Sequence, residues 1–405
     1  MQRNQKAADF WRGRKVLLTG HTGFKGAWML LWLRNMGAEV TGYALQPSTE
    51  PNLWAIVGSG ARSIIGDIRD EAKVRDLMTE TKPNIVIHMA AQALVRESYR
   101  DPLATYGTNV MGTANVLQAC RAARDLECVV VVTSDKVYEN LGTGRAFVEG
   151  DRLGGHDPYS NSKACAELLT SSFRDSFFGD GPPIASARAG NVIGGGDWSA
   201  DRLIPDCVRA LQAGGPVMLR YPDAVRPWQH VLEPLSGYLA LAQALVEAPA
   251  TAPRAVNFGP DPASFCSVHE VVDAFSARFA GKPGWKRDGS AQPAEAQALT
   301  LSSSLAERSL EWRPSLSIEE SLSWTADWYR AYAAGENMLD ITRAQLAQYQ
   351  EHAKRGAPSG PVAPSVPVAR SGPVASSGGP VVSSGGPVAS STPVAPSRAA
   401  ASHNR

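Results

Sequence analysis

The sequence predicts an α/β protein built on a doubly wound parallel sheet, with a smaller C-terminal lobe and a disordered tail. Three observations predict this fold class. Strand-like and helix-like segments alternate through the first half of the chain. The strand-like segments are continuous apolar runs, which is typical of a parallel sheet covered on both faces. A glycine-rich turn directly follows the first of these runs.

The predicted elements follow one another along the chain in a regular order. Strands are expected at 14–19, 40–45, 63–67, 84–88 and 128–133, and two more, at 184–188 and 255–258, can extend the sheet. Helices are expected at 27–33, 71–79 and 109–123. A further helix begins at Asp157-Pro158, because aspartate favours the N-cap and proline the first helical position. Segments near 195–230 and 265–330 are expected to form the smaller lobe.

The composition fits a globular protein with a large core. The 405 residues are 43% hydrophobic and 20% charged. Five of the 40 basic residues lie beyond position 353, so residues 1–351 hold 35 basic and 39 acidic side chains, a net charge of −4. An acidic body without a basic stripe argues against nucleic acid as the main partner. No apolar run reaches the 18 residues of a membrane-spanning helix, and the N-terminus lacks the apolar core of a signal peptide.

The cysteines and the C-terminal segment add two further expectations. The five cysteines show no CxxC spacing, which favours reduced thiols in a cytoplasmic protein. No cluster of His and Cys has the spacing of a metal site, so no metal is expected. Residues 356–405 form a degenerate repeat of Gly, Pro, Val, Ala and Ser without aromatic residues. Such a segment cannot bury enough apolar surface to offset its ordering entropy, so we expect it to be disordered.

The glycine-rich turn indicates a dinucleotide cofactor. Gly20, Gly23 and Gly26 have GxxGxxG spacing between a strand and a helix, where a pyrophosphate can approach the free N–H groups of the helix N-terminus. This is the Rossmann-type arrangement, and its candidate cofactor residues are Gly20, Thr22, Gly23, Phe24, Lys25 and Gly26. The second strand ends without an acid for the ribose and without an arginine for a 2′-phosphate, which favours NAD over NADP. Asp67 and Ile68, after the third strand, are expected to border the adenine.

Two groups of polar residues indicate proton chemistry. Tyr159 and Lys163 lie at i, i+4 on the helix after the fifth strand, where the ammonium is expected to lower the pKa of the phenol and make Tyr159 a base. Ser134, Asp135 and Lys136 stand together directly after the fifth strand. A hydroxyl, an acid and an amine at the end of a buried strand indicate an active site rather than a simple cap.

Longer motifs narrow the family. The chain resembles the extended short-chain dehydrogenase/reductase family and, within it, the CDP-glucose 4,6-dehydratases, from about residue 10 to 351. The motifs are TGHTGFKG at 19–26, HMAAQ at 88–92 with LVR at 94–96, TSDK at 133–136, DPYSNSK at 157–163, RAGNVIGGGDW at 188–198 and RPWQHVLEP at 226–234. The tail has no counterpart in this family.

The resemblance implies a redox-neutral hydro-lyase. NAD would accept a hydride from C4 of the glucose, a 4-ketone would acidify the C5 proton, the C6 hydroxyl would leave as water, and the hydride would return to C6. Residues 1–187 would then bind NAD, 188–351 would mainly bind the nucleotide sugar while some segments return to the sheet, and 356–405 would be the tail. Ala90 and Ala91 join the candidate cofactor residues, together with Tyr159 and Lys163.

The resemblance also suggests individual roles. Ser134 would bond the C4 oxygen, Asp135 would protonate the leaving hydroxyl, and Lys136 stands where related dTDP-glucose dehydratases carry a glutamate base. Lys136 could take the C5 proton if it is neutral, or it could stay charged and stabilise the enolate; the sequence leaves both open. The candidate substrate contacts are Arg96, Asn191, Arg202, Arg226 and His230, and for His230 a place in the core is an equal alternative.

The sequence also leaves alternatives for the substrate and the class of protein. The stretch 139–156 is shorter and poorer in aromatic residues than in the family, so the base or the sugar can differ. A 4-epimerase needs Tyr159 and Lys163 but has no use for Asp135, and a dinucleotide sensor needs none of the three. Helices at 109–123 and 163–178 could join copies into a homodimer or homotetramer. The product class commonly feeds deoxysugars of surface polysaccharides such as lipopolysaccharide O-antigen.

Overall fold

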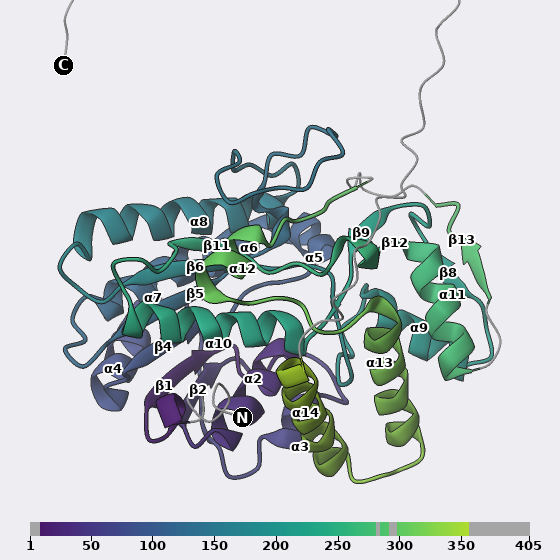
Figure 1. Cartoon of the computed structure of the whole chain (residues 1–405), viewed down its shortest axis with the longest axis horizontal. Helices are drawn as coiled ribbons and strands as arrows, with labels where there is room; N and C mark the ends of the chain where they lie inside the picture. The colour runs from purple at the N-terminus through teal and green to yellow at the C-terminus, as the bar shows by residue number, and fades with distance from the viewer. Residues whose placement is uncertain (1–8, 281–283, 291–297, 356–405) are drawn as a thin grey trace, which may run out of the picture. The chain divides into compact units, whose positions relative to one another are not determined.

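The computed structural model describes residues 9–280, 284–290 and 298–355, which belong to one compact unit (Figure 1). The tail expected at 356–405 lies outside the described residues. Among the described helices, none is both long and apolar enough to cross a membrane.

A seven-stranded sheet, parallel at every pairing, confirms the predicted fold class. Its spatial order is β11-β6-β5-β4-β1-β2-β3. The strands are β1 Lys15–Thr19, β2 Glu39–Ala44, β3 Arg62–Ile65, β4 Ile85–His88, β5 Cys128–Val132, β6 Ile184–Arg188 and β11 Ala255–Asn257. The order reverses between β1 and β4, and the crevice beyond the carboxyl ends of the strands at such a point is where ligands bind in open α/β sheets.

Helices cover both faces of the sheet. Val16 and Leu18 of β1 share a core cluster with helices α2 (Phe24–Asn35) and α10 (Leu232–Glu247). Leu17 points the other way, into a cluster with α4 (Glu71–Thr81) and α7 (Gly112–Cys120), and α8 (Pro158–Phe177) packs beside α7 (Figure 1). Because successive residues of a strand face opposite layers and both layers are apolar, the strands read as uninterrupted apolar runs.

The helix expected at 109–123 has two parts in the structure. A π-helical turn at Gly107–Met111 leads into α7. Asn109, in this turn, is fully buried. Its side chain accepts a hydrogen bond from the Gln92 N–H at 2.9 Å and donates to the Ser162 hydroxyl at 2.8 Å. The wider turn thus lies where the helix holds the loop after β4 against α8, and periodicity alone does not reveal such a turn.

The remaining described elements lie around the sheet and in the smaller lobe. The helices are α3 Leu53–Val57, α5 Val95–Arg100, α6 Pro102–Tyr106, α9 Leu203–Gln212, α11 Val268–Phe279, α12 Ser304–Leu310, α13 Ile318–Ala333 and α14 Met338–Arg355, with short 3₁₀ turns at Asp135–Val137 and Pro262–Ser264. The short strands pair as β7 Val192–Ile193 with β10 Gln229–His230, β8 Val217–Leu219 with β13 Trp285–Arg287, and β9 Val225–Pro227 with β12 Phe265–Ser267. Helix α11 packs on α9, β8 and β13, and Figure 1 shows these four together at the right.

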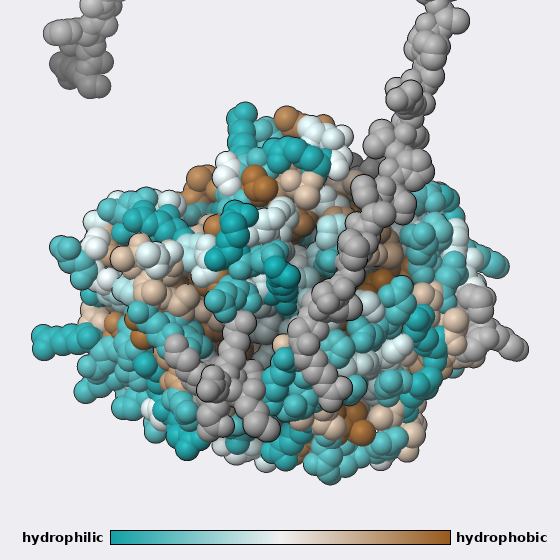
Figure 2. All heavy atoms as spheres, viewed as in Figure 1, coloured by the Kyte–Doolittle hydropathy of each residue, from teal (hydrophilic) through white to brown (hydrophobic). Residues whose placement is uncertain are grey.

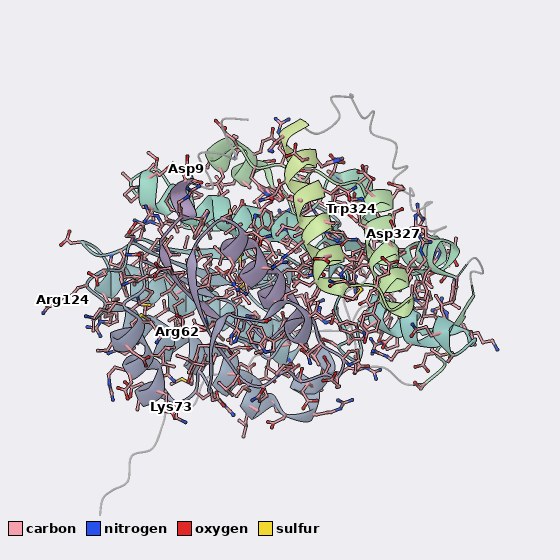
Figure 3. The ribbon with its side chains drawn as sticks, turned by 90° about the horizontal axis from the view of Figure 1, so that it is seen from below. Asp9, Arg62, Lys73, Arg124, Trp324 and Asp327 are labelled. Atoms are coloured by element: carbon pink, nitrogen blue, oxygen red, sulfur yellow. The ribbon has the colours of Figure 1, made fainter. Side chains whose placement is uncertain are left out.

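The surface has the character of a water-facing protein on the side that Figure 2 shows, where hydrophilic residues predominate and apolar ones form small patches. Charged side chains such as Arg62, Lys73 and Arg124 point outward around the sheet in Figure 3. Trp324 of α13 instead lies beside α14, where its carbonyl accepts a hydrogen bond from the Gln345 amide at 2.7 Å.

A buried ion pair connects the carboxyl end of β5 with α8 and β6. The Arg188 guanidinium donates to the Glu167 carboxylate at 2.7 Å, and both side chains are less than 5% exposed. Glu167 also accepts hydrogen bonds from the hydroxyls of Thr133 and Ser186. A second guanidinium nitrogen of Arg188 donates to the Tyr138 hydroxyl at 2.8 Å. The bonds from Arg188 and from the two hydroxyls hold the pKa of Glu167 below its ordinary value, although burial acts the other way.

We expect Glu167→Gln to destabilise the fold by about 3–5 kcal/mol, because it leaves the Arg188 charge buried without its partner. The double variant Glu167→Gln/Arg188→Met removes both charges and should recover part of this loss. Urea unfolding of the wild type, both single variants and the double variant measures the coupling free energy. Additive single effects would contradict the role given to this pair.

We also expect the free energy of unfolding to fall as the pH drops below about 6.5. Burial lowers the pKa of His21 to about 4 and the pKa of His88 and His230 to about 3, so these residues stay neutral in the fold but become protonated on unfolding. Burial raises the pKa of Glu233 to about 7, which opposes the effect by one proton. The net uptake near pH 5 is about two protons, or about 3 kcal/mol per pH unit. Urea unfolding at pH 5, 6 and 7 tests this, and a constant or rising stability toward pH 5 would contradict it.

Candidate active site

The glycine-rich turn lies at the carboxyl end of β1, beside the reversal in strand order. The Gly20 N–H donates to the Tyr43 carbonyl at 2.9 Å, and Gly20 has a φ of +78°. A Cβ on Gly20 would lie 2.7 Å from the Ala90 nitrogen, and one on Gly26 would lie 2.1 Å from the Gly20 oxygen. Any side chain at these two positions would therefore open the turn and push away the loop after β4.

The start of α2 fits the pyrophosphate of a dinucleotide. Gly23 is its N-cap and provides no side-chain hydrogen bond, and the first turn contains no acidic residue. The N–H groups of this turn are thus left for an anion, which the helix dipole also attracts. Thr22 is tied to the second strand's end, because its hydroxyl donates to the Leu45 carbonyl at 2.9 Å.

The region beyond β2 and β3 explains the missing acid. The His21 ring occupies the place of a side chain at Gly42, since a Cβ there would lie 2.3 Å from that ring. His21 bonds to the Ser63 hydroxyl at 2.7 Å. The Asp67 carboxylate is already bonded by the Arg69 guanidinium at 2.6 Å, whereas Ile68 is buried against Gly112. The turn residue His21 therefore fills the strand position that most dinucleotide sites leave open.

Ser134 and Asp135 lie buried at the carboxyl end of β5. Ser134 begins the short 3₁₀ turn, accepts a bond from the Lys136 N–H at 3.2 Å and donates its hydroxyl proton to Asp135 Oδ1 at 2.9 Å. Asp135 is 1% exposed, and its Oδ2 has no hydrogen-bond partner among the described residues. The Gly190 backbone lies directly against this carboxylate, because a Cβ there would lie 1.9 Å from Asp135 Cγ. Lys136 is half-buried in the same turn.

Tyr159 and Lys163 face this strand end from α8. The helix begins as predicted, with the Asp157 carboxylate accepting the Ser160 N–H at 2.9 Å. Tyr159 hydrogen-bonds to Ser134, and the Lys163 ammonium donates to the Val132 carbonyl at 3.2 Å. The structure thus brings Ser134, Asp135, Tyr159 and Lys163 together.

The expected direction of the Tyr159 pKa was wrong. Burial raises the pKa of Tyr159, and the bond to Ser134 and the charge of Arg202 only partly oppose it. Burial also lowers the pKa of Lys163 to about 8, despite the neighbouring Glu167. In a dry site both ionised forms lose hydration, and this loss outweighs the charge of the lysine.

A second tyrosine–lysine pair lies beside the first, and the sequence did not reveal it. The Lys25 ammonium donates to the Tyr238 hydroxyl at 2.8 Å, between helices α2 and α10. Burial lowers the pKa of Lys25 to about 7, and the charges of Lys163 and Arg202 add to this effect. The charges of Tyr159 and Asp135 act on Tyr238, whose pKa burial raises. Tyr238 lies in an apolar helical run, so no local pattern marks it.

The predicted substrate residues occupy different surroundings. The Arg202 guanidinium donates to the Ala93 carbonyl at 3.0 Å, and its charge acts on Lys25 and Tyr159 at the reaction centre. Arg96 lies 3.6 Å from Asp201, which also pairs with Arg220 at 3.1 Å.

Arg226 and Asn191 are held by their own backbones and neighbours. Arg226 is buried on β9, where it donates to the Val225 carbonyl at 2.9 Å. Asn191 adopts a left-handed φ of +47°, and its carbonyl accepts the Gln229 N–H at 3.3 Å.

His230 lies in the core. Its ring is fully buried with edge contacts to Trp28 and Trp324, at centroid distances of 6.3 and 5.9 Å. This place agrees with the core alternative, so we leave His230 out of the proposed substrate contacts.

The stretch 139–156 folds back on the chain. Phe147 stacks on Tyr138 at 4.8 Å and is 7% exposed, and Arg145 pairs with Asp151 at 2.6 Å. Phe147 therefore anchors this loop rather than offering a ring to a ligand. No group of three or more His, Cys, Asp or Glu residues that could hold a metal ion occurs in the described ranges.

Comparisons with known proteins agree with this geometry. Residues 16–259 match the model of the NAD dependent epimerase/dehydratase family. The chain is 46% identical over 355 residues to the CDP-glucose 4,6-dehydratase of Salmonella typhimurium, covering 86% of this chain and 99% of that protein. It is 29% identical to a dTDP-glucose 4,6-dehydratase of Xanthomonas campestris pv. campestris, covering 77% and 92%. The structure of the Thermus thermophilus UDP-glucose 4-epimerase in complex with NAD superposes with a TM-score of 0.68, at 27% identity and covering 78% and 99%.

These matches cover the sheet, the glycine-rich turn and the Tyr159–Lys163 pair, and they confirm both the resemblance and NAD as the cofactor. The chain belongs to the NAD dependent epimerase/dehydratase family.

Proposed function

We propose that this protein catalyses the NAD-dependent dehydration of CDP-glucose to CDP-4-keto-6-deoxyglucose. The observation that carries the proposal is the buried Asp135, joined through Ser134 to Tyr159. Oxidation at C4 needs a base but no acid. An acid beside that base is required when a hydroxyl must leave as water. The 46% identity to a CDP-glucose 4,6-dehydratase supports the same substrate.

The residues divide the work at the sugar. NAD, bound at the start of α2, supplies the hydride acceptor for C4 and the hydride donor for C6. Tyr159 takes the C4 hydroxyl proton, and Lys163 supports its negative charge. Asp135 gives its proton to the C6 hydroxyl through the unpartnered Oδ2. Lys136 stands at the same strand end, where it can take the C5 proton as an amine or stabilise the enolate as a cation.

The two parts of the chain divide the ligands. We assign NAD to residues 1–187, with Gly20, Gly23 and Gly26 at the pyrophosphate. Residues 188–351 mainly receive the nucleotide sugar. Arginine pairs well with diphosphate oxygens, so we assign the diphosphate to Arg202 and Arg226.

The second candidate function is 4-epimerisation, favoured by the likeness to the Thermus UDP-glucose 4-epimerase. Asp135 separates the two functions. An epimerase returns the hydride to C4 and loses no water, so the acid would have no task.

Incubation with CDP-glucose should give a product lighter by one water, without net NADH. Asp135→Asn should lower kcat by about 10²–10⁴-fold while NAD binding is kept, because the amide cannot donate the proton. Mass spectrometry of the product and fluorescence titration of NAD measure both effects. The control substrates are dTDP-, UDP- and GDP-glucose. An epimer of unchanged mass, or full activity of Asp135→Asn, would contradict the dehydratase assignment.

We also propose that copies of the chain associate through the layer of α6, α7 and α8. Large apolar side chains lie exposed there: Leu103 on α6 is 83% exposed, Met111 before α7 58%, and Leu168 on α8 58%. Exposed apolar groups on neighbouring helices fit an interface between copies. We propose a cytoplasmic location as well, since all five cysteines are free, and a product that feeds surface deoxysugars such as those of lipopolysaccharide O-antigen.

Light scattering should show a dimer or tetramer for the wild type, and Leu168→Glu should shift it to monomers because the charge would be buried at the contact. Leu141→Glu is the matched control, since Leu141 is 72% exposed in the 139–156 loop, away from these helices. A monomeric wild type, or an unchanged assembly of Leu168→Glu, would contradict the proposal.

A further inference from the structure

The proposed reaction leaves two residues in the wrong protonation state after each turnover, and this inference rests on that proposed function. Tyr159 gains the proton of the C4 hydroxyl, and Asp135 loses one to the departing C6 hydroxyl. The C5 proton is removed and then restored at C5, so it cancels. One proton must therefore move from Tyr159 to Asp135 before the next substrate can react.

We propose that Ser134 carries this proton, so that the proton released at C4 in one turnover leaves within the water formed at C6 in the next. Its hydroxyl lies between the two residues: it donates to Asp135 Oδ1 at 2.9 Å, and it is hydrogen-bonded to Tyr159. Because its own proton points to the carboxylate, its oxygen is left to accept from the phenol.

The transfer balances without any group from outside. The Tyr159 O–H bond breaks as a new O–H bond forms on the Ser134 oxygen. The original Ser134 O–H bond breaks as one forms on Asp135 Oδ1. The serine ends unchanged, the phenol becomes the phenolate needed at C4, and the carboxylate becomes the acid needed at C6. No proton from solvent is consumed.

The packing isolates this path. Ser134, Asp135 and Tyr159 are 4%, 1% and 8% exposed. The Gly190 backbone closes over the carboxylate, which leaves no room for a water on that side. A side chain must therefore make the connection, and Ser134 is the hydroxyl that bonds to both partners.

The surrounding charges suit a negative charge that moves between two oxygens. Lys25 on α2, Lys163 on α8 and Arg202 before α9 are the basic groups around the site, and Tyr238 on α10 adds a neutral phenol. The charge of Lys25 acts on Asp135, while that of Arg202 acts on Tyr159. Each end of the path thus has a cation nearby, so neither location of the charge is left without compensation.

The experiment compares the wild type, Ser134→Ala and Ser134→Thr. Product per active site is followed by rapid quench over the first turnovers and in the steady state. In Ser134→Ala the first turnover should slow less than later ones, giving a burst followed by a steady rate about 10²-fold below that of the wild type. Small weak acids such as imidazolium should raise that slow rate. Ser134→Thr keeps the hydroxyl and should show neither the burst nor the dependence on the added acid.

Other roles for Ser134 give different results. If it only bonds the C4 oxygen or caps the 3₁₀ turn, Ser134→Ala will slow the first turnover and the steady state by one factor, whatever the buffer, and the relay is overturned. Thermal unfolding of both variants measures the capping contribution. A wild type that forms no dehydrated product overturns the proposed function and the relay together, whereas an active wild type with a burst-free, buffer-independent Ser134→Ala overturns the relay alone.

Discussion

The buried pair of Arg188 and Glu167 is the interaction on which the site depends most. It holds together three elements that carry the chemistry: the end of β5 through Thr133, the helix α8 and the strand β6. Ser134 follows Thr133 directly, and Tyr159 and Lys163 lie two turns and one turn before Glu167 on the same helix. A charge pair excluded from water tolerates little displacement, because a lost bond leaves a charge without compensation. The distance between the acid and the base of the reaction is therefore fixed from beneath.

The site built on this support contains more cations than anions. Lys25, Lys163 and Arg202 surround the single carboxylate of Asp135. Two diphosphates, one of the cofactor and one of the sugar nucleotide, would bring the missing negative charge. The low pKa of Lys25 follows from this crowding and from burial, that of Lys163 from burial, and bound anions should raise both. The fold keeps the reaction centre dry and leaves the ligands to complete its charge balance.

Local patterns predicted the sheet and much of the site. The apolar runs, the glycine spacing and the Tyr159–Lys163 pair depend on neighbours a few residues apart, so the sequence displays them directly. The contacts that it does not display join distant positions, such as Lys25 with Tyr238 or Glu167 with Arg188. A buried tyrosine in an apolar helix and a core histidine such as His230 look alike in sequence whether or not they face a ligand. The pKa of Tyr159 was misjudged for a related reason, because burial is a property of the whole fold.

The central claim is that one sugar is oxidised at C4 and reduced at C6 without exchange of its hydrogen. Incubation with CDP-glucose that carries deuterium at C4 tests this directly. The account predicts a dehydrated product that holds the deuterium at C6, within the same molecule. Deuterium that stays at C4 of an epimer, or that is lost to solvent, would contradict it.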